Sequence, residues 1–502
     1  MPGSDRTGRW RLALVSGLVG CGWMGTELVS VRALAPWFGT SGGVWTRVIA
    51  VVLVAGSAGA LLGARASSRG HAARTLFLAL TSASAWIAIS CSGLTSLAET
   101  LAPPLGTNPA DASPLLSIGS LSVAVLMLAL PVLLMSMTSP LLAGLGLPLG
   151  TTLAASTLGG LLALPLTAGG ILNSLGPRGA LTGCAILFSL AAMLLPVTGR
   201  LRMVGWILLL ILIPLVHEGP DARRWTESPD GCTEAEVLAL AETDYQHVHL
   251  SRVLRPDGAS ETRLALDEGL GEFHSLRIDG SDFTGQYYDL MGIALAESRP
   301  GARVLVLGGG AGTQEAVLRA QYGAHIESIH SLEIDPKLAS FIRLFAPQRN
   351  VRDRWMAGDA RRGLASSATR FDAIFLDAFA HQLALPAHLG SREFLSEVVT
   401  HLADDGVFAL NVSAGNLEGP LMQAILATLQ TTFDGLSIWP VKDSWSAVVL
   451  ATRSVAHAVH SSTRDIGGAA TAARSFRWRP AHSAARVLMD DIAPLEALSR
   501  QR

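Results

Sequence analysis

Long apolar stretches fill the first two-fifths of the chain, and short apolar runs broken by polar residues fill the rest. Seven long stretches can be drawn. Each is near the ~20 residues that a helix needs to cross a bilayer, although the last two are shorter. Glycine and proline inside them do not argue against helices in lipid. The pattern therefore predicts a polytopic helical membrane domain over residues 1–218. The stretches are residues 12–31, 44–62, 75–92, 116–137, 151–172, 181–195 and 203–216.

The second part of the chain combines two further patterns. Short alternating runs at 247–250 and 263–266 flank the turn Pro256-Asp257-Gly258, which predicts a small antiparallel β-domain. From Arg303 onward, strand and helix patterns alternate, as in a doubly wound, Rossmann-like parallel sheet. We expect a linker and β-domain over 219–290, the Rossmann-like domain over 291–455, and a flexible loop with the C-terminal segment over 456–502. The strands expected in the parallel sheet are residues 303–307, 328–333, 354–357, 373–376, 407–411, 435–440 and 447–451.

Composition supports the membrane assignment and argues against several kinds of partner. Hydrophobic residues make up 49% of the chain and charged residues 16%, which is low for a soluble protein. The formal net charge of −2 gives no bias towards nucleic acid. The cysteines include no Cys-X-X-Cys pair, so we expect no metal site and no disulfide framework.

Basic residues set the expected orientation of the protein in a cell membrane. If the stretches alternate in direction, three arginine-containing segments fall on one side, while Glu99 and Asp111 fall on the other. The positive-inside rule then puts the N-terminus in the cytoplasm. Seven crossings would put the soluble domain outside, which conflicts with a cytosolic cofactor, so the span count, the rule or the cofactor assignment must give way. The segments carry Arg6, Arg9 and Arg11; Arg65, Arg69 and Arg74; and Arg200 and Arg202.

The first stretch has two features with alternative interpretations. Ala33-Leu34-Ala35 resembles a signal-peptide cleavage site, but six further stretches favour an uncleaved anchor. Glu27 is an ionisable group within the membrane, which is by default a functional-site hypothesis. The simpler alternative is that Glu27 pairs with Arg32 or Arg47 near the membrane surface and fixes helix packing.

Glycines and acids at strand ends indicate the chemistry of the soluble part. The first expected strand runs into Gly308-Gly309-Gly310-Ala311-Gly312, where glycine lets the backbone turn sharply and approach a ligand. Glu333 ends the next strand, where a carboxylate can accept both ribose hydroxyls. Asp359 follows the third strand, where it can accept from an adenine amino group, and Asp377 ends the fourth. A single such acid is often a helix cap, whereas three in succession favour a nucleoside site.

Several further motifs accompany the glycine turn. They are Tyr245-Gln246-His247, Leu266-Asp267-Glu268-Gly269, Leu332-Glu333-Ile334-Asp335-Pro336, Gly358-Asp359-Ala360, Asp377-Ala378-Phe379 with Pro386 and His388-Leu389, and residues 489–494, with 130–135 and 156–159 in the membrane part. With this set, the chain resembles the spermidine synthase family, and most of all its membrane-fused members. The resemblance implies a class I methyltransferase-like fold and homodimers.

The resemblance also implies roles for individual residues. The donor would be decarboxylated S-adenosylmethionine or S-adenosylmethionine, and the acceptor an amine. Displacement at the carbon beside the sulfonium would rest mainly on alignment, with Asp377 taking up the proton of the attacking amine. The donor would be bound by Gly308, Gly310, Gly312, Glu333 at the ribose, Asp359 at the adenine, and Gln246. The substrate side would hold Tyr287 and Asp289, with Asp490 and Asp491 either closing the site or forming an exposed turn.

Two positions depart from the family pattern. Ala311 and Ala380 stand where the family has aspartates that face the amine groups. Three functions therefore stay open. The first is an aminopropyltransferase of polyamine biosynthesis in the membrane. The second, favoured by Ala311, is an S-adenosylmethionine-dependent methyltransferase acting on a membrane-associated acceptor. The third is a non-catalytic transporter or sensor with a nucleoside- or polyamine-binding domain, for which Glu27 is the support.

Overall fold

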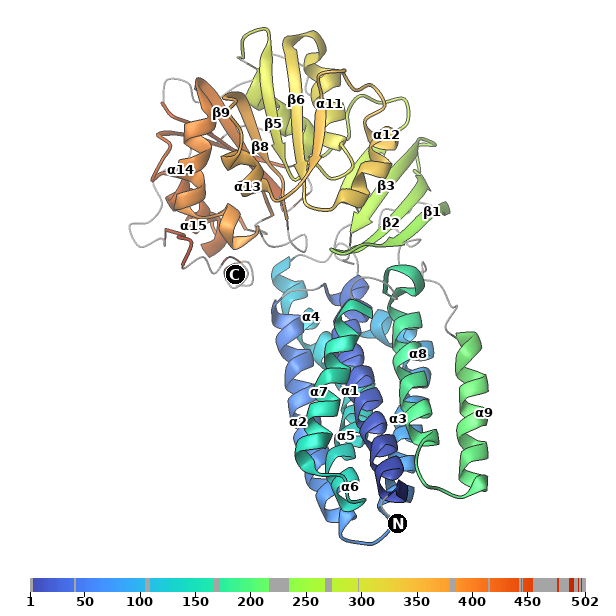
Figure 1. Cartoon of the computed structure of the whole chain (residues 1–502). Coiled ribbons are helices and arrows are strands. Elements are labelled where there is room, and N and C mark those ends of the chain that lie inside the picture. Colours follow the sequence, from blue (N-terminus) through green and yellow to red (C-terminus); the bar gives the residue numbers. More distant parts are fainter. Residues whose placement is uncertain are drawn as a thin grey trace.

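A computed structural model of the chain shows a bundle of helices with two β-sheets standing on one end of it (Figure 1). The residues that the structure describes are 3–39, 42–103, 109–166, 172–215, 234–266, 273–296, 298–379, 385–413, 416–441, 444, 446–454, 476–477, 487–491, 495 and 498. Ala380 and residues 267–269 lie outside these ranges. The helices come first in the sequence and the sheets follow, as the hydrophobic pattern predicts.

The helices of the bundle run alternately towards and away from the sheets (Figure 1). Helix α1 starts at the end remote from the sheets, and α9 ends near them, so the bundle begins and finishes at opposite ends. The elements are α1 (Gly3–Phe38), α2 (Gly42–Ser67), α3 (Ala72–Leu101), α4 (Pro109–Ala124), the π-helical turn η1 (Val125–Ala129), α5 (Leu130–Ser136), α6 (Thr138–Gly144), α7 (Leu149–Leu166), α8 (Leu172–Met193) and α9 (Gly199–Leu215).

The described helices do not fix the number of membrane crossings. Among the described residues, five helical segments are long and apolar enough to cross a membrane. Helix α7 is apolar but shorter, and α9 has 17 residues. Several long apolar helices are therefore present, and the count of seven stays a prediction. The five segments are Gly8–Phe38, Gly42–Ser67, Ala72–Leu94, Pro114–Gly144 and Leu175–Met193.

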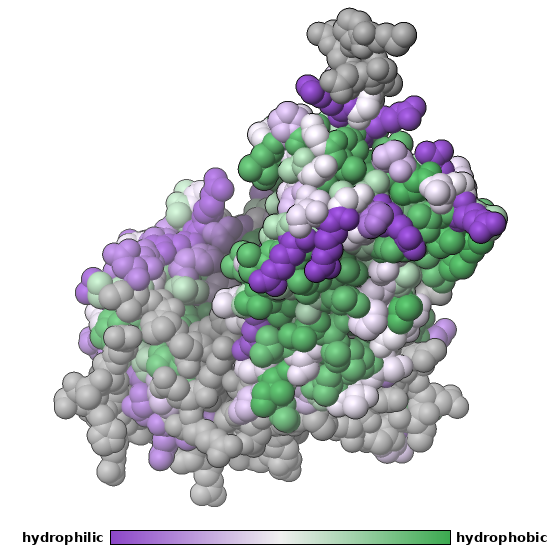
Figure 2. Space-filling view, turned by 90° about the horizontal axis from the view of Figure 1, so that it is seen from below, coloured by the Kyte–Doolittle hydropathy of each residue, from purple (hydrophilic) through white to green (hydrophobic). Residues whose placement is uncertain are grey.

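Small residues let helices of the bundle approach each other closely. Helices α1 and α7 meet where a Cβ added to Gly159 would lie 1.9 Å from the backbone oxygen of Gly17. Large apolar side chains such as Leu53, Leu158 and Leu210 are exposed instead of buried. Seen from below, hydrophobic side chains cover much of the bundle, while hydrophilic ones lie across its end (Figure 2). An extensive exposed apolar surface of this kind is typical of a membrane interaction site.

The expected ion pairs of Glu27 are not formed. Arg32 bonds to Glu242 of the β-domain, and Arg47 bonds to serine hydroxyls of α4. Within the described part of the chain, no ion pair joins Glu27 to either arginine. The expectation that Glu27 pairs with one of these arginines is therefore wrong, because Arg32 contacts the β-domain and Arg47 contacts α4.

The smaller sheet has four antiparallel strands in the order β1-β2-β3-β4 and stands directly above the bundle in Figure 1. The strands are β1 (Glu234–Glu242), β2 (His247–Leu254), β3 (Ser260–Leu266) and β4 (Ser275–Ile278). The turn with Asp257 joins β2 to β3, where the N–H of Arg255 donates to the oxygen of Ala259 at 2.9 Å. The expected small antiparallel sheet is therefore present.

The larger sheet has the order β12-β10-β11-β9-β8-β5-β6-β7. Strands β5 to β9 pair in parallel, but β10 and β11 are antiparallel, which corrects the expectation of a wholly parallel sheet. Only five residues separate the end of β10 at Pro440 from the start of β11 at Ser446, too few for a crossover, so the two strands pair as a hairpin. The strands are β5 (Ala302–Leu307), β6 (Ile326–Glu333), β7 (Arg354–Ala357), β8 (Phe371–Leu376), β9 (Leu402–Ser413), β10 (Gly435–Pro440), β11 (Ser446–Thr452) and β12 (Phe476–Arg477).

Helices cover both faces of the larger sheet. Alternate residues of β5 and β8 enter two different cores, with Leu305 and Ile374 on one face and Val304 and Phe375 on the other. Because β5, β6, β7, β8 and β9 are parallel, their carboxyl ends gather at one edge. The remaining elements are α10 (Tyr287–Met291), η4 (Gly292–Leu295), α11 (Thr313–Tyr322), η5 (Gly323–His325), η6 (Pro336–Phe341), α12 (Ile342–Phe345), α13 (Ala360–Ala365), η7 (Ala387–Leu389), α14 (Arg392–His401) and α15 (Pro420–Leu429).

Candidate functional site

A glycine turn follows β5 and brings the ends of three strands together. Gly308, Gly310 and Gly312 have φ values of 90°, 49° and 96°, in the left-handed region that favours glycine. A Cβ added to Gly308 would lie 2.4 Å from the backbone oxygen of Asp377, so no larger residue fits there. The turn therefore requires glycine, as the sequence predicts, and it lies against the end of β8.

Glu333, the last residue of β6, is held against this turn. Its carboxylate accepts a hydrogen bond from the N–H of Gly310 at 2.9 Å and another from the N–H of Asp335 at 3.1 Å. Burial raises the pKa of Glu333, while these backbone hydrogen bonds oppose the rise. The carboxylate is therefore fixed beside the turn.

Gln246 reaches the same place from the β-domain. Its Nε2 donates to Oδ2 of Asp335 at 3.1 Å, and Oδ1 of Asp335 accepts from the N–H of Lys337 at 3.0 Å. Asp335 is fully buried and caps η6. It was not among the residues selected from the sequence, although it belongs to the Leu332-Glu333-Ile334-Asp335 motif and follows a strand end.

Asp377 follows β8 and accepts hydrogen bonds from two other elements. Oδ2 accepts from the hydroxyl of Tyr287 on α10, and Oδ1 accepts from Nδ2 of Asn411 on β9, each at 2.9 Å. Burial raises the pKa of Asp377 to about 7, with the two hydrogen bonds opposing the rise and nearby Glu333 adding to it. Burial also raises the pKa of Tyr287 well above its usual value, so Tyr287 remains a donor. A carboxyl group that titrates near pH 7 is suited to accept a proton under neutral conditions.

Sequence reasoning missed Asn411. The residue lies in β9, next to β8 in the sheet, and its side chain is buried. A signal was available, because residues 407–411 were expected as a strand with Asn411 at its end. The prediction rested on acids at strand ends, whereas an amide group also orients a carboxylate by hydrogen bonding.

Asp359 acts as a helix cap, which was the alternative to a binding role. Its Oδ1 accepts from the N–H of Arg362 at 2.9 Å, and its Oδ2 lies 3.0 Å from Nε2 of His388. Although burial alone would raise its pKa, the hydrogen bonds from Arg362 and His388 lower the pKa of Asp359 below its usual value. Both oxygens already have partners, so any contact with adenine would have to share or replace His388.

Asp289 is fully buried and shapes the loop before Tyr287. Its carboxylate accepts from the N–H and hydroxyl of Thr284, both at 3.0 Å, and from the N–H of Gly285 at 2.7 Å. Burial raises the pKa of Asp289 to about 6, against the effect of these hydrogen bonds. In this arrangement Asp289 supports the start of α10 and does not face open space.

Asp490 and Asp491 lie in an exposed turn near the C-terminus, which was one of the two expectations for them. The carboxylate of Asp490 pairs with Arg361 of α13 at 2.8 Å. The hydrogen bonds from Arg361 and Ser391 lower the pKa of Asp490. The negative charge of Asp490 is therefore already balanced by Arg361, close to the Asp359 cap.

Ala311 lies inside an apolar cluster between the glycine turn and the β-domain. It is fully buried and packs with Val248, Leu264 and Phe345 among others. Its N–H donates to the hydroxyl of Ser275 at 3.0 Å. The side-chain position that carries an aspartate in the resembled family is therefore occupied here by a methyl group in apolar surroundings.

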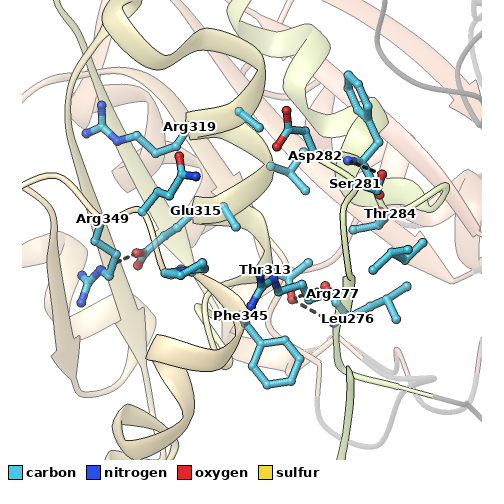
Figure 3. Close-up of a pocket in the computed structure, with 18 of the residues that line it drawn as sticks. Leu276, Arg277, Ser281, Asp282, Thr284, Thr313, Glu315, Arg319, Phe345 and Arg349 are labelled. Atoms are coloured by element: carbon cyan, nitrogen blue, oxygen red, sulfur yellow. Dashed lines mark hydrogen bonds and ion pairs between the residues drawn. The ribbon is translucent and has the colours of Figure 1, made fainter. Parts of the chain in front are cut away.

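A cavity beside the larger sheet is lined by other residues than these. It has a volume of about 290 Å³ and is lined by the loop after β4, the side of α11 and the segment after α12 (Figure 3). Glu315 and Arg349 form an ion pair at its wall, at 3.0 Å. None of the predicted site residues lines this cavity, and within the described residues no group of His, Cys, Asp and Glu gathers in a way that would hold a metal ion.

Comparison with known proteins identifies the domain that carries this site. Residues 286–442 match the model of the spermine/spermidine synthase domain. These residues are therefore similar to the spermine/spermidine synthase domain. The matched residues include Tyr287, the glycine turn, Asp377 and Asn411, and the match confirms the resemblance to the spermidine synthase family.

Individual relatives match different shares of the chain. A polyamine aminopropyltransferase from Vibrio vulnificus (strain CMCP6) is 34% identical over 116 residues, which is 22% of this chain and 37% of that protein. This chain therefore spans little more than a third of the length of that relative. Among solved structures, a probable spermidine synthase from Corynebacterium glutamicum is 18% identical, with 51% of this chain and 96% of that chain covered and a TM-score of 0.41. Spermidine synthase from Thermotoga maritima is 16% identical, with 44% and 73% covered and a TM-score of 0.35.

Proposed function

We propose that this protein is a membrane-bound transferase of the polyamine aminopropyltransferase type. It would move an aminopropyl group from decarboxylated S-adenosylmethionine to an amine. The observation that carries the proposal is the carboxyl group of Asp377, held by Tyr287 and Asn411 beside the glycine turn. All of these residues fall within the spermine/spermidine synthase match.

The donor would bind across the carboxyl ends of β5, β6 and β7. Glu333 would accept the ribose hydroxyls, and the glycine turn would allow the backbone to approach the donor closely. Asp359 would accept from the adenine amino group after His388 moves aside or shares the oxygen. Because the donor is a sulfonium cation, the carboxylates of Glu333 and Asp377 also favour its charge.

The transfer would be a direct displacement. The lone pair of a neutral amine attacks the carbon beside the sulfonium, a C–N bond forms, and the C–S bond breaks with its electrons going to sulfur. The products are a neutral thioether nucleoside and an alkylated ammonium group, whose extra proton passes to the Asp377 carboxylate. Tyr287 and Asn411 hold that carboxylate in one direction, so alignment and proton uptake supply the catalysis.

A second candidate is methyl transfer to a membrane-associated acceptor. The specific observation is Ala311, which is buried among apolar residues and offers no carboxylate to a donor amine. The same displacement at the methyl carbon of S-adenosylmethionine would need no such carboxylate. The two candidates share the nucleoside contacts and differ in the group that moves.

For the membrane part, we propose seven crossings of a lipid bilayer, formed by α1, α2, α3, α4 to α5, α7, α8 and α9. The exposed apolar side chains of the bundle support this placement. The arginine-rich segments, including Arg65 and Arg200, would lie on the cytoplasmic side by the positive-inside rule. The soluble domain would then face the other side.

Labelled donors test these proposals on the full-length protein in lipid nanodiscs. One donor carries isotope in the aminopropyl carbons of decarboxylated S-adenosylmethionine and the other in the methyl group of S-adenosylmethionine. Putrescine and a membrane lipid extract serve as acceptor probes. Aminopropyl incorporation supports the first candidate and methyl incorporation the second. Binding of nucleoside without transfer of either label would contradict both and point to a sensor or transporter.

A further inference from the structure

An arginine of the membrane part reaches into the β-domain. Arg32 lies near the end of α1, and its side chain is only 14% exposed. Its Nη2 donates to Oε2 of Glu242 at 2.9 Å and to the oxygen of Thr243 at 3.3 Å. Its Nη1 donates to the oxygen of Tyr245 at 2.8 Å. The planar guanidinium group therefore holds one turn of the β-domain at three points, which an ammonium group cannot do with the same geometry.

Glu242 connects this arginine to two further elements. Its Oε1 lies 2.6 Å from Nδ1 of His247 on β2, and its backbone oxygen accepts from Nζ of Lys337 at 2.8 Å. The side chains of Glu242 and His247 are each 5% exposed. Because a buried carboxylate that loses its partner is strongly destabilising, the contact with Arg32 is hard to replace.

The turn that follows Glu242 places Gln246 near Glu333, where we propose that the nucleoside binds. The hydroxyl oxygen of Thr243 accepts from the N–H of Gln246 at 2.9 Å, which fixes the turn. The side chain of Gln246 donates to Asp335 at 3.1 Å, and the N–H of Asp335 donates to Glu333 at 3.1 Å. A continuous set of hydrogen bonds therefore runs from α1 to the carboxylate of Glu333.

We propose that Arg32 is a positioning residue for the nucleoside site. Helix α1 would set the place of the turn 243–246, and through Gln246 and Asp335 it would set the direction of Glu333. This inference rests on the proposed function, because it requires a nucleoside to bind at Glu333. It gives the helical bundle a part in donor binding, beyond that of holding the domain at the membrane.

If the contact of Arg32 only held the bundle and the β-domain together, a change at Arg32 would alter stability and leave nucleoside affinity unchanged. The two possibilities therefore differ in a measurable way. If Arg32 acts through Gln246, then removing Gln246 removes the route, and a change at Arg32 should have little further effect on affinity. Coupled residues of this kind give non-additive effects in a double-mutant cycle.

The test measures binding of 5′-methylthioadenosine, the thioether nucleoside that aminopropyl transfer leaves, to the full-length protein in nanodiscs. We expect Arg32→Gln and Gln246→Ala each to raise the Kd about tenfold, within the range of measured couplings between sites. The double variant should bind about as weakly as either single variant. The matched control is Arg47→Gln, because Arg47 bonds within the bundle to Ser117 and Ser120, and this variant should leave the Kd unchanged.

Each outcome bears on a different statement. Unchanged affinity in Arg32→Gln, or losses that simply add in the double variant, overturns the inference and leaves the proposed function standing. A wild-type protein that does not bind the probe overturns both. Thermal unfolding shows whether Arg32→Gln folds; if it does not, Arg32→Lys keeps a charge for Glu242 but lacks the contacts to the Thr243 and Tyr245 oxygens. That variant should unfold near the wild-type temperature and still bind the probe more weakly.

Discussion

The position of Asp377 at the end of β8 suits it to accept a proton. The end of β8 is packed against the glycine turn, and burial of the Asp377 carboxyl group raises its pKa to about 7. Tyr287 and Asn411 oppose that rise by donating to the two oxygens. The balance of these effects leaves a carboxyl group whose pKa lies near neutral pH and whose direction is fixed.

Replacing the Asp377 carboxylate should separate catalysis from binding. We expect Asp377→Asn to lower kcat by about 10²- to 10⁴-fold, the usual contribution of a positioned acid or base, with little change in nucleoside affinity. Because the pKa of Asp377 is higher in the folded state, the cost of ionising it there grows between about pH 4 and about pH 7 and is complete above that, so the variant should not melt earlier at pH 8. Asp372→Asn, on the same strand, is the control. Full activity of Asp377→Asn would remove the proposed mechanism.

The pH dependence of turnover should report the same carboxyl group. Since proton uptake needs the ionised form, kcat should rise with pH through about 7. In Tyr287→Phe, the carboxylate loses a hydrogen bond that lowers its pKa, so the rise should move to higher pH. The measurement is kcat between pH 5 and 9 for both proteins. A midpoint that stays fixed or moves to lower pH in Tyr287→Phe contradicts the assignment.

Periodicity along the chain was enough to predict most of the elements. The strands of the larger sheet lie within a few residues of their expected positions, because buried parallel strands are continuous apolar runs. The antiparallel direction of β10 and β11 was missed, because an apolar run carries no sign of direction. Asp359 illustrates the limit for the site, since strand position alone cannot distinguish a helix cap from a ligand contact, and here the cap is formed.

Close packing of α1 on α7 gives a test of the bundle at the level of helices. A Cβ at Gly159 would meet the backbone oxygen of Gly17 at 1.9 Å, whereas one at Gly160 would have its nearest neighbour, the oxygen of Gly20, at 3.6 Å. We expect Gly159→Ala to destabilise the protein by about 1–3 kcal/mol through overpacking. Gly160→Ala should be neutral or stabilising by up to about 1 kcal/mol, because alanine favours helix. Melting temperatures in one detergent compare the pair, and equal values would contradict the crossing.

The contact between the helical bundle and the β-domain is visible only in the whole molecule. Arg32 and Glu242 are 210 positions apart in the chain, and hydrophobic periodicity contains no information on which charged residues meet. From the sequence, Arg32 was a candidate partner for Glu27, because it directly follows the apolar stretch that contains Glu27. In the structure Arg32 pairs with Glu242 instead, because the β-domain stands directly above the bundle and its buried Glu242 needs a cation.

The path of the bundle fixes the relation between the two ends of the membrane part. Helix α1 starts at the end remote from the sheets and α9 finishes near them (Figure 1), so reporters fused to the N-terminus and to the C-terminus should lie on opposite sides of the membrane. Arg65 lies in the last turn of α2 and Arg200 at the start of α9, both at the remote end, so the positive-inside rule predicts a cytoplasmic N-terminus. The measurement is accessibility of each reporter to a membrane-impermeant label in intact cells.

The three possible results have different consequences for donor supply. An exposed C-terminal reporter with a cytoplasmic N-terminus means that the nucleoside must reach the site from outside the cytoplasm. The reverse arrangement would keep seven crossings, bring the site to the cytosolic donor, and show that the arginines do not control orientation. Both reporters on one side would require an even number of crossings, and α7 or α9, the short helices, would then be the segment that does not cross.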